Sequence, residues 1–471
     1  MVNLRGRVKF PIGGIVRERS DTQDLTWVQV RIWCNSKTDS IVWMEEDNNS
    51  TNQCNLFCYL TYVKNKGGLF LLCLCFWIYV FFSWILALNG RYFVLSGLFF
   101  CRKEVEVLEK QDFMMHAIAL AKKGIGMVDP NPLVGAVLVK NGQIIGEGYH
   151  VYFGGLHAER NAIANCQTSL EGATLFVTLE PCCHTGKTPP CTEAILQAGI
   201  RHVVIGSKDP NPLVAGKGIA QLRQAGVTVE EDFLKAECDA LNAPFFHYIT
   251  KKQPYVAMKY AMTADGKIAT TTGASQWVTN AESRRHVHTL RRKYMAILSG
   301  IGTVLADNPL LNCRLGDNGR NPIRIICDSH LRIPLDSQLV QTANEIPVWI
   351  ATCANDSQKK EALQQKGVEI LSFEGETVPL PALMDKLGEK QISSILLECG
   401  STLNAAMLEA GLVQRVYGYI GAKIFGGMGA KSPVGGTGVT LPDDAPLLHL
   451  VETQTFGNDI LCVYDIKQEE L

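Results

Sequence analysis

A histidine, a glutamate and two cysteines between residues 157 and 191 are the side chains of this sequence best suited to metal chemistry. His157 and Glu159 form a His-x-Glu pair, Cys182 follows a proline, and Cys191 follows two prolines. One imidazole and two thiolates are a natural ligand set for a zinc ion that keeps its fourth position for water. Glu159 is too close to His157 to be a convenient fourth ligand. The residues therefore predict a catalytic zinc site with Glu159 beside it.

The chemistry that this set predicts is hydrolysis. Zinc with an open position lowers the pKa of a bound water toward about 7. Glu159 would take a proton from that water and deliver it to a departing amine. A His-x-Glu pair followed by a Pro-Cys and a second cysteine is typical of zinc deaminases that act on nucleobase-like rings. The spacing from Cys182 to Cys191 is wider than in the commoner Pro-Cys-x-x-Cys motif. This difference narrows the class of zinc deaminases to which the chain could belong.

Each expected ligand stands at the end of a predicted element. His157 begins a helix that runs to about residue 165, and the apolar strand 173–179 leads directly to Cys182. Cys191 begins a helix after two prolines, which are tolerated at a helix start. Helix N-termini carry partial positive charge and stabilise thiolates. Any one of these residues alone is explained as well by a buried thiol or a surface histidine, but the set favours a metal.

Two neighbouring side chains leave the ligand set open. Cys183 and His184 follow Cys182 directly, and either could reach the same metal. We prefer Cys182 because it directly follows the proline at the end of the predicted strand.

The elements around the metal residues predict an α/β fold in two parts, residues 109–252 and 253–471, divided near a Lys-Lys-Gln-Pro stretch. In the first part, Asn141-Gly142 between two apolar runs is a strong hairpin signal. The expected helices there are 113–123, 157–165, 191–198 and 218–225, and the expected strands are 136–140, 143–148, 173–179 and 202–206. The second part has expected helices at 281–293 and 400–410 and expected strands at 255–261, 294–298, 323–328, 348–351, 369–373 and 395–398.

Residues 1–108 differ from the rest of the chain. Leu69–Leu88 is a run without a charged residue that is long enough to span a bilayer. One interpretation is a membrane anchor. The other, which we favour, is that this extension is not part of the working enzyme, because helix-like sequence typical of a soluble enzyme starts near Asp112. Met114 and Met115 would then be possible translation starts.

Composition narrows the remaining classes. The 45 basic and 46 acidic residues nearly cancel, so charge gives no reason to expect a nucleic-acid partner. The 16 cysteines do not have the spacing of a secreted disulfide framework. We expect a cytoplasmic enzyme with a small-molecule substrate, and a homo-oligomer whose number of subunits the sequence leaves open.

From about residue 109 onward the chain resembles the bifunctional riboflavin-biosynthesis deaminase–reductase family. The resemblance covers about three quarters of the chain and stops at the N-terminal extension. The motifs that carry it are DPNPLVGAVLV, GEGYH, HAE, VTLEPCCHTGKTPPC, DPNPLVAGKG, KYAMTADGKIA, SQWVT, GIGTVLADNPLL and LLECGSTLNAA. It implies a cytidine-deaminase-like α/β/α domain followed by a dihydrofolate-reductase-like α/β domain.

The resemblance also implies two reactions and the residues for them. The first is zinc-dependent deamination of 2,5-diamino-6-(5-phosphoribosylamino)pyrimidin-4-one, and the second is NADPH-dependent reduction of its ribosyl group to ribityl. The zinc ligands would be His157, Cys182 and Cys191, with Glu159 as the proton shuttle. The deaminase substrate would contact Asn131, His150 and Lys187. The reductase substrate would contact Ser275, Arg291, Leu311, Arg314 and Glu398. The NADPH site would comprise Ala261, Trp277, Thr303, Asp307, Ser329, Gly400, Ser401, Thr402, Leu403, Asn404, Ala405 and Ala406.

Without the resemblance, the reductase site is only weakly indicated. A Gly-x-Gly-x-x-Gly motif after a first strand is missing from the sequence, so a Rossmann site is not expected. The helix that starts after Gly400 could hold a pyrophosphate through its backbone N–H groups. Arg291 and Arg314 suit a phosphate, although Arg291 in a basic run could simply face solvent. Trp277 could be an ordinary core aromatic, and Lys187 a solvated loop residue.

Three alternatives to the bifunctional enzyme remain. Only one of the two activities could be retained, although every expected zinc residue is present. A membrane-tethered binding protein with a structural zinc would depend on Leu69–Leu88 alone, and it would leave Glu159 without a role. A nucleic-acid base deaminase is opposed by the overall charge and by the reductase-like second half.

Overall fold

The computed structural model describes residues 109–185, 189–316 and 319–467, together with the backbone of seven strands between residues 15 and 99. The chain divides into two compact units, Met1–Glu106 and Val107–Leu471. Lys187 lies outside the described residues.

The first unit contains only strands among its described residues. Two of these strands, β5 and β6, contain much of the apolar run Leu69–Leu88. The part of the chain that the structure describes contains no helix long and apolar enough to cross a membrane. The strands are β1 (Ile15–Arg17), β2 (Trp27–Asn35), β3 (Ser40–Glu46), β4 (Thr61–Asn65), β5 (Gly68–Leu72), β6 (Val80–Leu88) and β7 (Arg91–Phe99).

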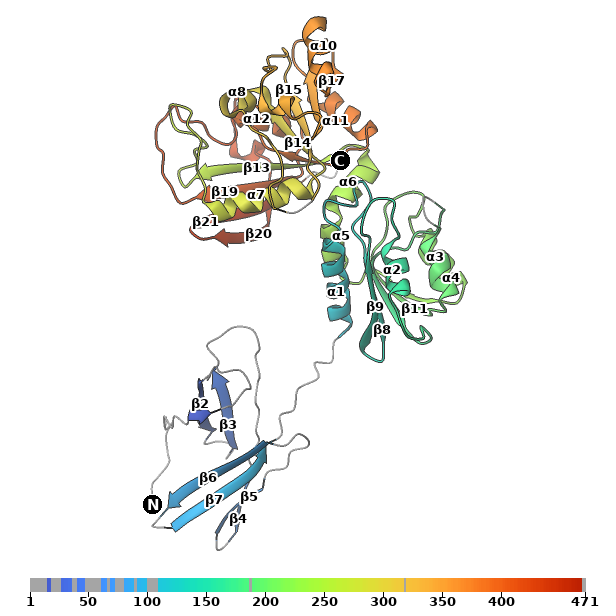
Figure 1. The fold of residues 1–471 in the computed structure, drawn as a ribbon, viewed down its shortest axis with the longest axis vertical. Helices are drawn as coiled ribbons and strands as arrows, with labels where there is room; N and C mark the ends of the chain where they lie inside the picture. Colours follow the sequence, from blue (N-terminus) through green and yellow to red (C-terminus); the bar gives the residue numbers. More distant parts are fainter. Residues whose placement is uncertain are drawn as a thin grey trace. The chain divides into compact units, whose positions relative to one another are not determined.

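The second unit begins with a five-stranded sheet in the order β12-β11-β10-β8-β9, whose strands β8, β9 and β11 are labelled on the right at mid-height in Figure 1. Strand β8 pairs antiparallel with β9 and β10, and β10, β11 and β12 run parallel. The Asn141-Gly142 turn joins β8 to β9, and both residues have the positive φ (52° and 74°) that such a tight hairpin requires. The strands are β8 (Gly135–Lys140), β9 (Gln143–Tyr149), β10 (Thr174–Leu179), β11 (His202–Ser207) and β12 (Thr228–Glu230).

Helices cover both faces of this sheet, so the domain has three layers, α/β/α. Helices α1 and α5 pack on one face, where Phe113, Val137, Phe176 and Cys238 belong to one buried cluster. On the other face, the strand residues that alternate with these pack against helices α2, α3 and α4. The helices are α1 (Lys110–Lys122), α2 (Ala158–Ala164), α3 (Cys191–Gln197), α4 (Lys217–Gln224) and α5 (Lys235–Leu241).

Helix α6 (Ala243–Lys251) leads into a nine-stranded sheet in the order β17-β16-β15-β14-β18-β13-β19-β21-β20. Neighbouring strands from β17 to β19 are parallel, whereas β21 and β20 add an antiparallel hairpin. The strands are β13 (Tyr255–Thr263), β14 (Ala296–Gly300), β15 (Ile323–Cys327), β16 (Val348–Thr352), β17 (Val368–Ser372), β18 (Ser394–Leu397), β19 (Arg415–Gly421), β20 (Leu448–Phe456) and β21 (Asp459–Ile466).

Helices again cover both faces. Helices α7, α8, α9 and α10 contribute to one buried cluster, and α11 and α12 contribute to the other. In a mostly parallel sheet with helices on both faces, ligands bind among the loops that follow the carboxyl ends of the strands. The helices are α7 (Ala281–Lys293), α8 (Ile301–Asp307), α9 (Gln338–Gln341), α10 (Ser357–Gln365), α11 (Leu380–Glu389) and α12 (Ser401–Glu409).

The observed elements confirm the predicted α/β class. The expected helices at 157–165 and 281–293 correspond to α2 and α7, and the expected hairpin corresponds to β8 and β9. The pattern did not predict the C-terminal hairpin, in which every residue of β20 from Leu448 to Thr455 is exposed. A strand that is exposed on both faces lacks the apolar alternation on which such predictions depend.

Candidate functional site

The three expected ligands come together although 34 residues separate the first from the last. His157 is the N-cap of α2, Cys191 is the first residue of α3, and Cys182 lies just beyond the end of β10. The Nδ1 atom of His157 is 3.5 Å from the Cys182 Sγ and 3.3 Å from the Cys191 Sγ. The three ligand atoms all lie within 4.8 Å of one another. Ligands that each sit about 2.0–2.3 Å from a tetrahedral zinc have this kind of separation.

The protonation of the two thiols also suits a metal. A hydrogen bond from the Cys191 thiol, with a smaller contribution from His157, lowers the pKa of Cys182 to about 4. That same hydrogen bond and burial raise the pKa of Cys191 well above its usual value. The hydrogen bond between the two thiols therefore favours ionisation of Cys182 and opposes that of Cys191. A divalent cation is what would let both thiols ionise, because metal binding and thiol deprotonation are coupled.

Glu159 lies in the first turn of α2 with only 3% of its surface exposed. Burial, together with the negative charge on Cys182, raises the pKa of the Glu159 carboxyl. A carboxyl group with a raised pKa can both accept and return a proton near neutral pH. The position and the pKa of Glu159 therefore suit a proton shuttle beside the three ligands.

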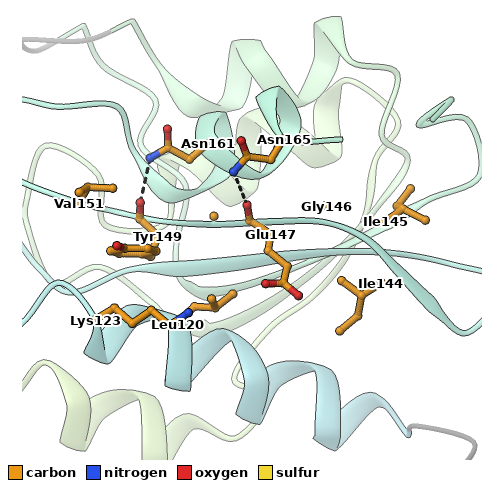
Figure 2. Close-up of a pocket in the computed structure, with 11 residues that line it drawn as sticks. Leu120, Lys123, Ile144, Ile145, Gly146, Glu147, Tyr149, Val151, Asn161 and Asn165 are labelled. Carbon is orange, nitrogen blue, oxygen red and sulfur yellow. Dashed lines mark hydrogen bonds between the residues drawn. The ribbon is translucent and has the colours of Figure 1, made fainter. Parts of the chain in front are cut away.

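Helix α2, which begins at His157 and carries Glu159, is held tightly against strand β9. The side-chain amides of Asn161 and Asn165 donate to the carbonyl oxygens of Tyr149 (2.8 Å) and Glu147 (2.9 Å), as Figure 2 shows. These groups line a hollow of about 560 Å³, whose lining includes none of the three ligands. The two amides already donate to carbonyl oxygens of the edge strand β9. We therefore interpret the hollow as the place where α2 is held against β9, and not as a ligand site.

A glycine permits this close contact. A Cβ atom on Gly148 would lie 2.3 Å from the Ala162 nitrogen and 2.4 Å from the Ala158 oxygen, both in the backbone of α2. We therefore expect Gly148→Ala to push α2 off the strand and to displace both His157 and Glu159. The expected result is a loss of bound zinc together with a fall in ammonia release of about a hundredfold, since such misplacement is costly.

The matched control for this substitution is Gly142→Ala. Gly142 lies in the β8–β9 turn, and a Cβ atom there would meet no heavy atom within 4 Å. Its positive φ makes alanine unfavourable by roughly 1–2 kcal/mol, so the control measures backbone strain without displacing α2. Metal analysis and ammonia assays on both variants test the expectation. Normal zinc content and activity in Gly148→Ala would contradict it.

The structure places two expected substrate residues, Asn131 and His150, next to the ligands. The Asn131 amide lies 3.3 Å from Nε2 of His150, whose Nδ1 is 3.1 Å from the carbonyl oxygen of Leu156. These partners fit a neutral ring that donates from Nδ1 and accepts at Nε2. Burial lowers the pKa of His150 and so favours that neutral form. The ring meets His157 edge-on at a centroid distance of 5.4 Å.

Cys183, whose role the sequence left open, lies outside the group of three ligand atoms. Its thiol is half-buried and donates to the carbonyl oxygen of Leu213 at 3.9 Å. Burial raises the pKa of this thiol, so it stays protonated where a zinc ligand would ionise.

A second polar cluster lies at the carboxyl end of β18 in the nine-stranded sheet. Glu398 is 8% exposed, and its Oε2 accepts from Nη2 (2.6 Å) and Nε (3.0 Å) of Arg291. The Lys259 ammonium lies 3.6 Å from the other carboxylate oxygen. Burial would raise the pKa of Glu398, but the two cations outweigh it and lower the pKa to about 2. Glu398 is therefore a fixed anion at neutral pH.

Lys259 is a site candidate that the sequence motifs did not reveal. Burial lowers its pKa, and the Glu398 carboxylate opposes that shift. A lysine in the middle of the otherwise apolar strand β13 was the available signal. Its partner, Glu398, follows β18 and is distant in the sequence. The sequence therefore did not show which group would compensate the charge of Lys259.

Of the two arginines expected at a phosphate, Arg314 is the more accessible. Arg291 uses Nε and Nη2 on Glu398 and Nη1 on the Asn312 carbonyl oxygen (3.0 Å). Arg314 is exposed, and its guanidinium donates to the Asn312 side chain. Leu311, by contrast, is 4% exposed in the hydrophobic core, so any substrate contact there would involve its backbone.

The expected NADPH residues lie on several elements. Ala261 is in β13, Thr303 and Asp307 are in α8, and Ser329 follows β15. Trp277 is 55% exposed and stacks 4.4 Å from the Arg284 guanidinium, so it is not a core aromatic.

Residues 400–406 and a glycine-rich segment at residues 426–438 meet at the start of α12. Gly435 N donates to the Ser401 carbonyl oxygen at 3.1 Å, and the Asn404 amide donates to the Pro433 carbonyl oxygen at 2.9 Å. Chain segments that lie far apart in the sequence thus converge on a helix N-terminus, which is a suitable place for phosphate groups.

A conservative change at Arg291 tests the polar cluster. Arg291→Lys is expected to raise the KM of the reductase step about 10- to 100-fold, because an ammonium cannot reproduce the two guanidinium hydrogen bonds that converge on the Glu398 Oε2. Ammonia release should not change. The control is Arg285→Lys, an exposed arginine on the same helix. Steady-state kinetics of each half-reaction measure the effect, and equal KM values for both variants would contradict the role.

Comparisons with known proteins agree with the fold. Residues 108–207 match the family model of the cytidine and deoxycytidylate deaminase zinc-binding region. Residues 254–462 match that of the RibD C-terminal domain. Within residues 108–462, a zinc-deaminase domain thus precedes a RibD-type reductase domain.

Whole-length relatives identify the family. The riboflavin biosynthesis protein RibD of Actinobacillus pleuropneumoniae is 56% identical over 355 residues, which is 75% of this chain and 94% of that protein. The Escherichia coli protein of the same name is 38% identical over 365 residues, 75% of this chain and 98% of that protein. This chain belongs to the RibD family of riboflavin biosynthesis proteins.

A solved structure supports the same assignment. The Thermotoga maritima diaminohydroxyphosphoribosylaminopyrimidine deaminase/5-amino-6-(5-phosphoribosylamino)uracil reductase is 40% identical and superposes with a TM-score of 0.69. The match covers 76% of this chain and 98% of that one. The RibD protein of Acinetobacter baumannii has the same TM-score at 34% identity, with 76% of this chain and 99% of that one covered.

Proposed function

We propose that this protein catalyses two consecutive steps of riboflavin biosynthesis. The first is hydrolytic deamination of 2,5-diamino-6-(5-phosphoribosylamino)pyrimidin-4-one to 5-amino-6-(5-phosphoribosylamino)uracil. The second is reduction of the ribosyl side chain to ribityl by NADPH. The observation that carries this proposal is the grouping of His157, Cys182 and Cys191 beside a buried Glu159, in a chain that also has a RibD-type reductase domain.

In the deaminase site, the three ligands would hold a zinc ion. That ion would act as a Lewis acid and make water nucleophilic near neutral pH. Glu159 accepts the proton of the attacking water and returns it to the departing amine. Its raised pKa suits both transfers. Asn131 and the neutral His150 would orient the pyrimidine ring at the wall of the site. We assign Lys187, which lies outside the described residues, to the substrate phosphate.

In the reductase site, NADPH supplies the hydride, and the protein supplies position and charge. We propose that Glu398, held by Arg291 and Lys259, fixes the ribosyl side chain through its carboxylate. Arg314, whose guanidinium is exposed, would take the substrate phosphate. Ser275 and the Leu311 backbone would complete the substrate site. The NADPH site would comprise Ala261, Trp277, Thr303, Asp307, Ser329 and residues 400–406 at the start of α12.

A coupled assay on the purified protein tests both halves. The diaminopyrimidine ribotide and NADPH are supplied together, and ammonia and NADPH oxidation are followed in parallel. We expect NADPH oxidation to depend on prior ammonia release, and the deaminated intermediate, supplied directly, to bypass that dependence. Ammonia release without NADPH oxidation from either substrate would refute the second activity.

We further propose that residues 109–471 form the working enzyme, divided near residue 252. The family models begin at residue 108, and the aligned relatives account for only about three quarters of this chain. We expect an immunoblot of the native protein, with an antibody against the reductase domain, to show a product clearly smaller than the full-length 51.8 kDa. A native product near 51.8 kDa would contradict this proposal.

A further inference from the structure

An ion pair joins the two domains between residues that neither site contains. Asp129 follows α1 in the first domain, and Arg320 precedes β15 in the second. The Arg320 Nη2 lies 2.8 Å from the Asp129 Oδ2, and the two side chains are only 30% and 18% exposed. Burial raises the pKa of the Asp129 carboxyl although Arg320 opposes that shift, so removing Arg320 would leave a largely buried carboxylate without its cation, which is costly.

Two glycines near this pair in the sequence lie close to Arg292. A Cβ atom on Gly126 would lie 2.6 Å from the carbonyl oxygen of Arg292. A Cβ atom on Gly319 would lie 2.6 Å from the Arg292 guanidinium. Arg292 of the second domain therefore packs closely against Gly126 of the first domain, three residues before Asp129, and this is a second contact between the domains near the ion pair.

On the first-domain side, the contact reaches the zinc ligands in a few steps. Asn131, two residues after Asp129, belongs to the same turn, which is closed by a 2.9 Å hydrogen bond from Asn131 N to the Val128 oxygen. The Asn131 amide bonds His150, and the His150 ring meets that of His157. A shift of Asp129 would therefore move Asn131 at the wall of the deaminase site.

On the second-domain side, the contact reaches the segment that carries Arg314. Asn321, next to Arg320, accepts a hydrogen bond from the backbone N–H of Cys313 at 2.9 Å. That bond ties Arg320 to the chain around Asn312, whose carbonyl oxygen accepts from Arg291. Arg314 N lies 3.3 Å from Nδ1 of His288 on α7. The position of Arg314 thus depends on where Arg320 is held.

We propose that Arg320 and Asp129 are positioning residues for both half-reactions, and that an arginine of the reductase domain thereby sets the substrate affinity of the deaminase site. The pair touches neither group of reacting atoms. It fixes the turn that carries Asn131 and the segment that carries Arg314 against each other. This inference rests on the proposed function, which defines the two substrates, and on the ion pair, which is the contact between the domains.

The test is a double-mutant cycle with each half-reaction assayed separately. Arg320→Ala is expected to raise the KM for ammonia release about tenfold, which matches the coupling energies of contacting residues. The KM for reduction of the deaminated intermediate should rise as well. Both kcat values should change less, and bound zinc should be unchanged. The charge-swapped double variant Asp129→Arg/Arg320→Asp should recover part of the lost affinity in both assays. Neither single swap should show this recovery.

Arg332→Ala, an exposed arginine of the same domain, is the matched control. Arg320→Lys keeps the charge, so it separates a positioning effect from failure to fold. Hydrogen exchange of residues 127–133 gives a readout that needs no substrate, and it should increase in Arg320→Ala. An effect confined to reduction, or strictly additive single changes, would overturn the inference. A wild-type protein that turned over neither substrate would instead refute the proposed function.

Discussion

Glu159→Gln is expected to reduce ammonia release by about 10²- to 10⁴-fold, the range that general acid–base catalysis contributes. Glutamine has nearly the same shape but cannot accept the proton of the attacking water. Glu159 is 3% exposed in the first turn of α2, so the substitution leaves the surface of the protein unchanged. Reduction of the deaminated intermediate should proceed at the wild-type rate, because that site lies on a separate sheet.

The control for this change is Glu193→Gln. Glu193 also lies in the first turn of a seven-residue helix next to a metal-binding segment, but it is exposed. Zinc content, ammonia release and NADPH oxidation are measured on both variants. A Glu159→Gln protein that contains zinc and deaminates normally would show that another group moves the proton.

Cys191→Ser is expected to abolish zinc binding at ordinary metal concentrations, and deamination with it. A serine hydroxyl does not ionise as a thiol does, and loss of a ligand should cost more than the roughly 10- to 100-fold in affinity that follows loss of a supporting group. Cys191 is also fully buried, so an outside ligand cannot easily replace it. Elemental analysis of the purified protein and ammonia assays with added zinc measure the two effects.

Cys166→Ser is the matched control, because Cys166 is half-buried in the same domain and its thiol donates to the carbonyl oxygen of Thr168. It should retain zinc and activity. If Cys191→Ser kept a full equivalent of zinc, Cys183 or His184 would have to be the third ligand. Repeating the measurement with Cys183→Ser and His184→Ala would then distinguish the two.

The metal residues were predictable because their signals are local. His157 begins α2 and Cys191 begins α3, as the prolines and the apolar spacing indicated. The α/β class followed from the alternation of strands and helices in the same way. Individual roles of the ligands and of Glu159 remain predictions that the experiments above address.

The rest depends on contacts that no local pattern contains. The charge of Lys259 is compensated by Glu398 beside another strand, and the domain contact joins Asp129 to Arg320 across 191 residues. Gly148 has the sequence context of an ordinary strand residue, and only its distance to the α2 backbone shows why a side chain is excluded there. The length of Leu69–Leu88 suggested a membrane span, yet two parts of it are strands, because apolar length alone does not distinguish the two conformations.

The attachment of α2 to β9 has a consequence for how the protein acquires its metal. Two asparagine amides and a glycine fix the start of the helix through the main chain, without any contribution from the ligands themselves. The position of the histidine therefore depends on main-chain contacts of α2, and metal loading should require the loss of a thiol proton more than a rearrangement of the backbone. Metal exchange in this family member should accordingly be a local and reversible event, unlike the coupled folding of small zinc domains.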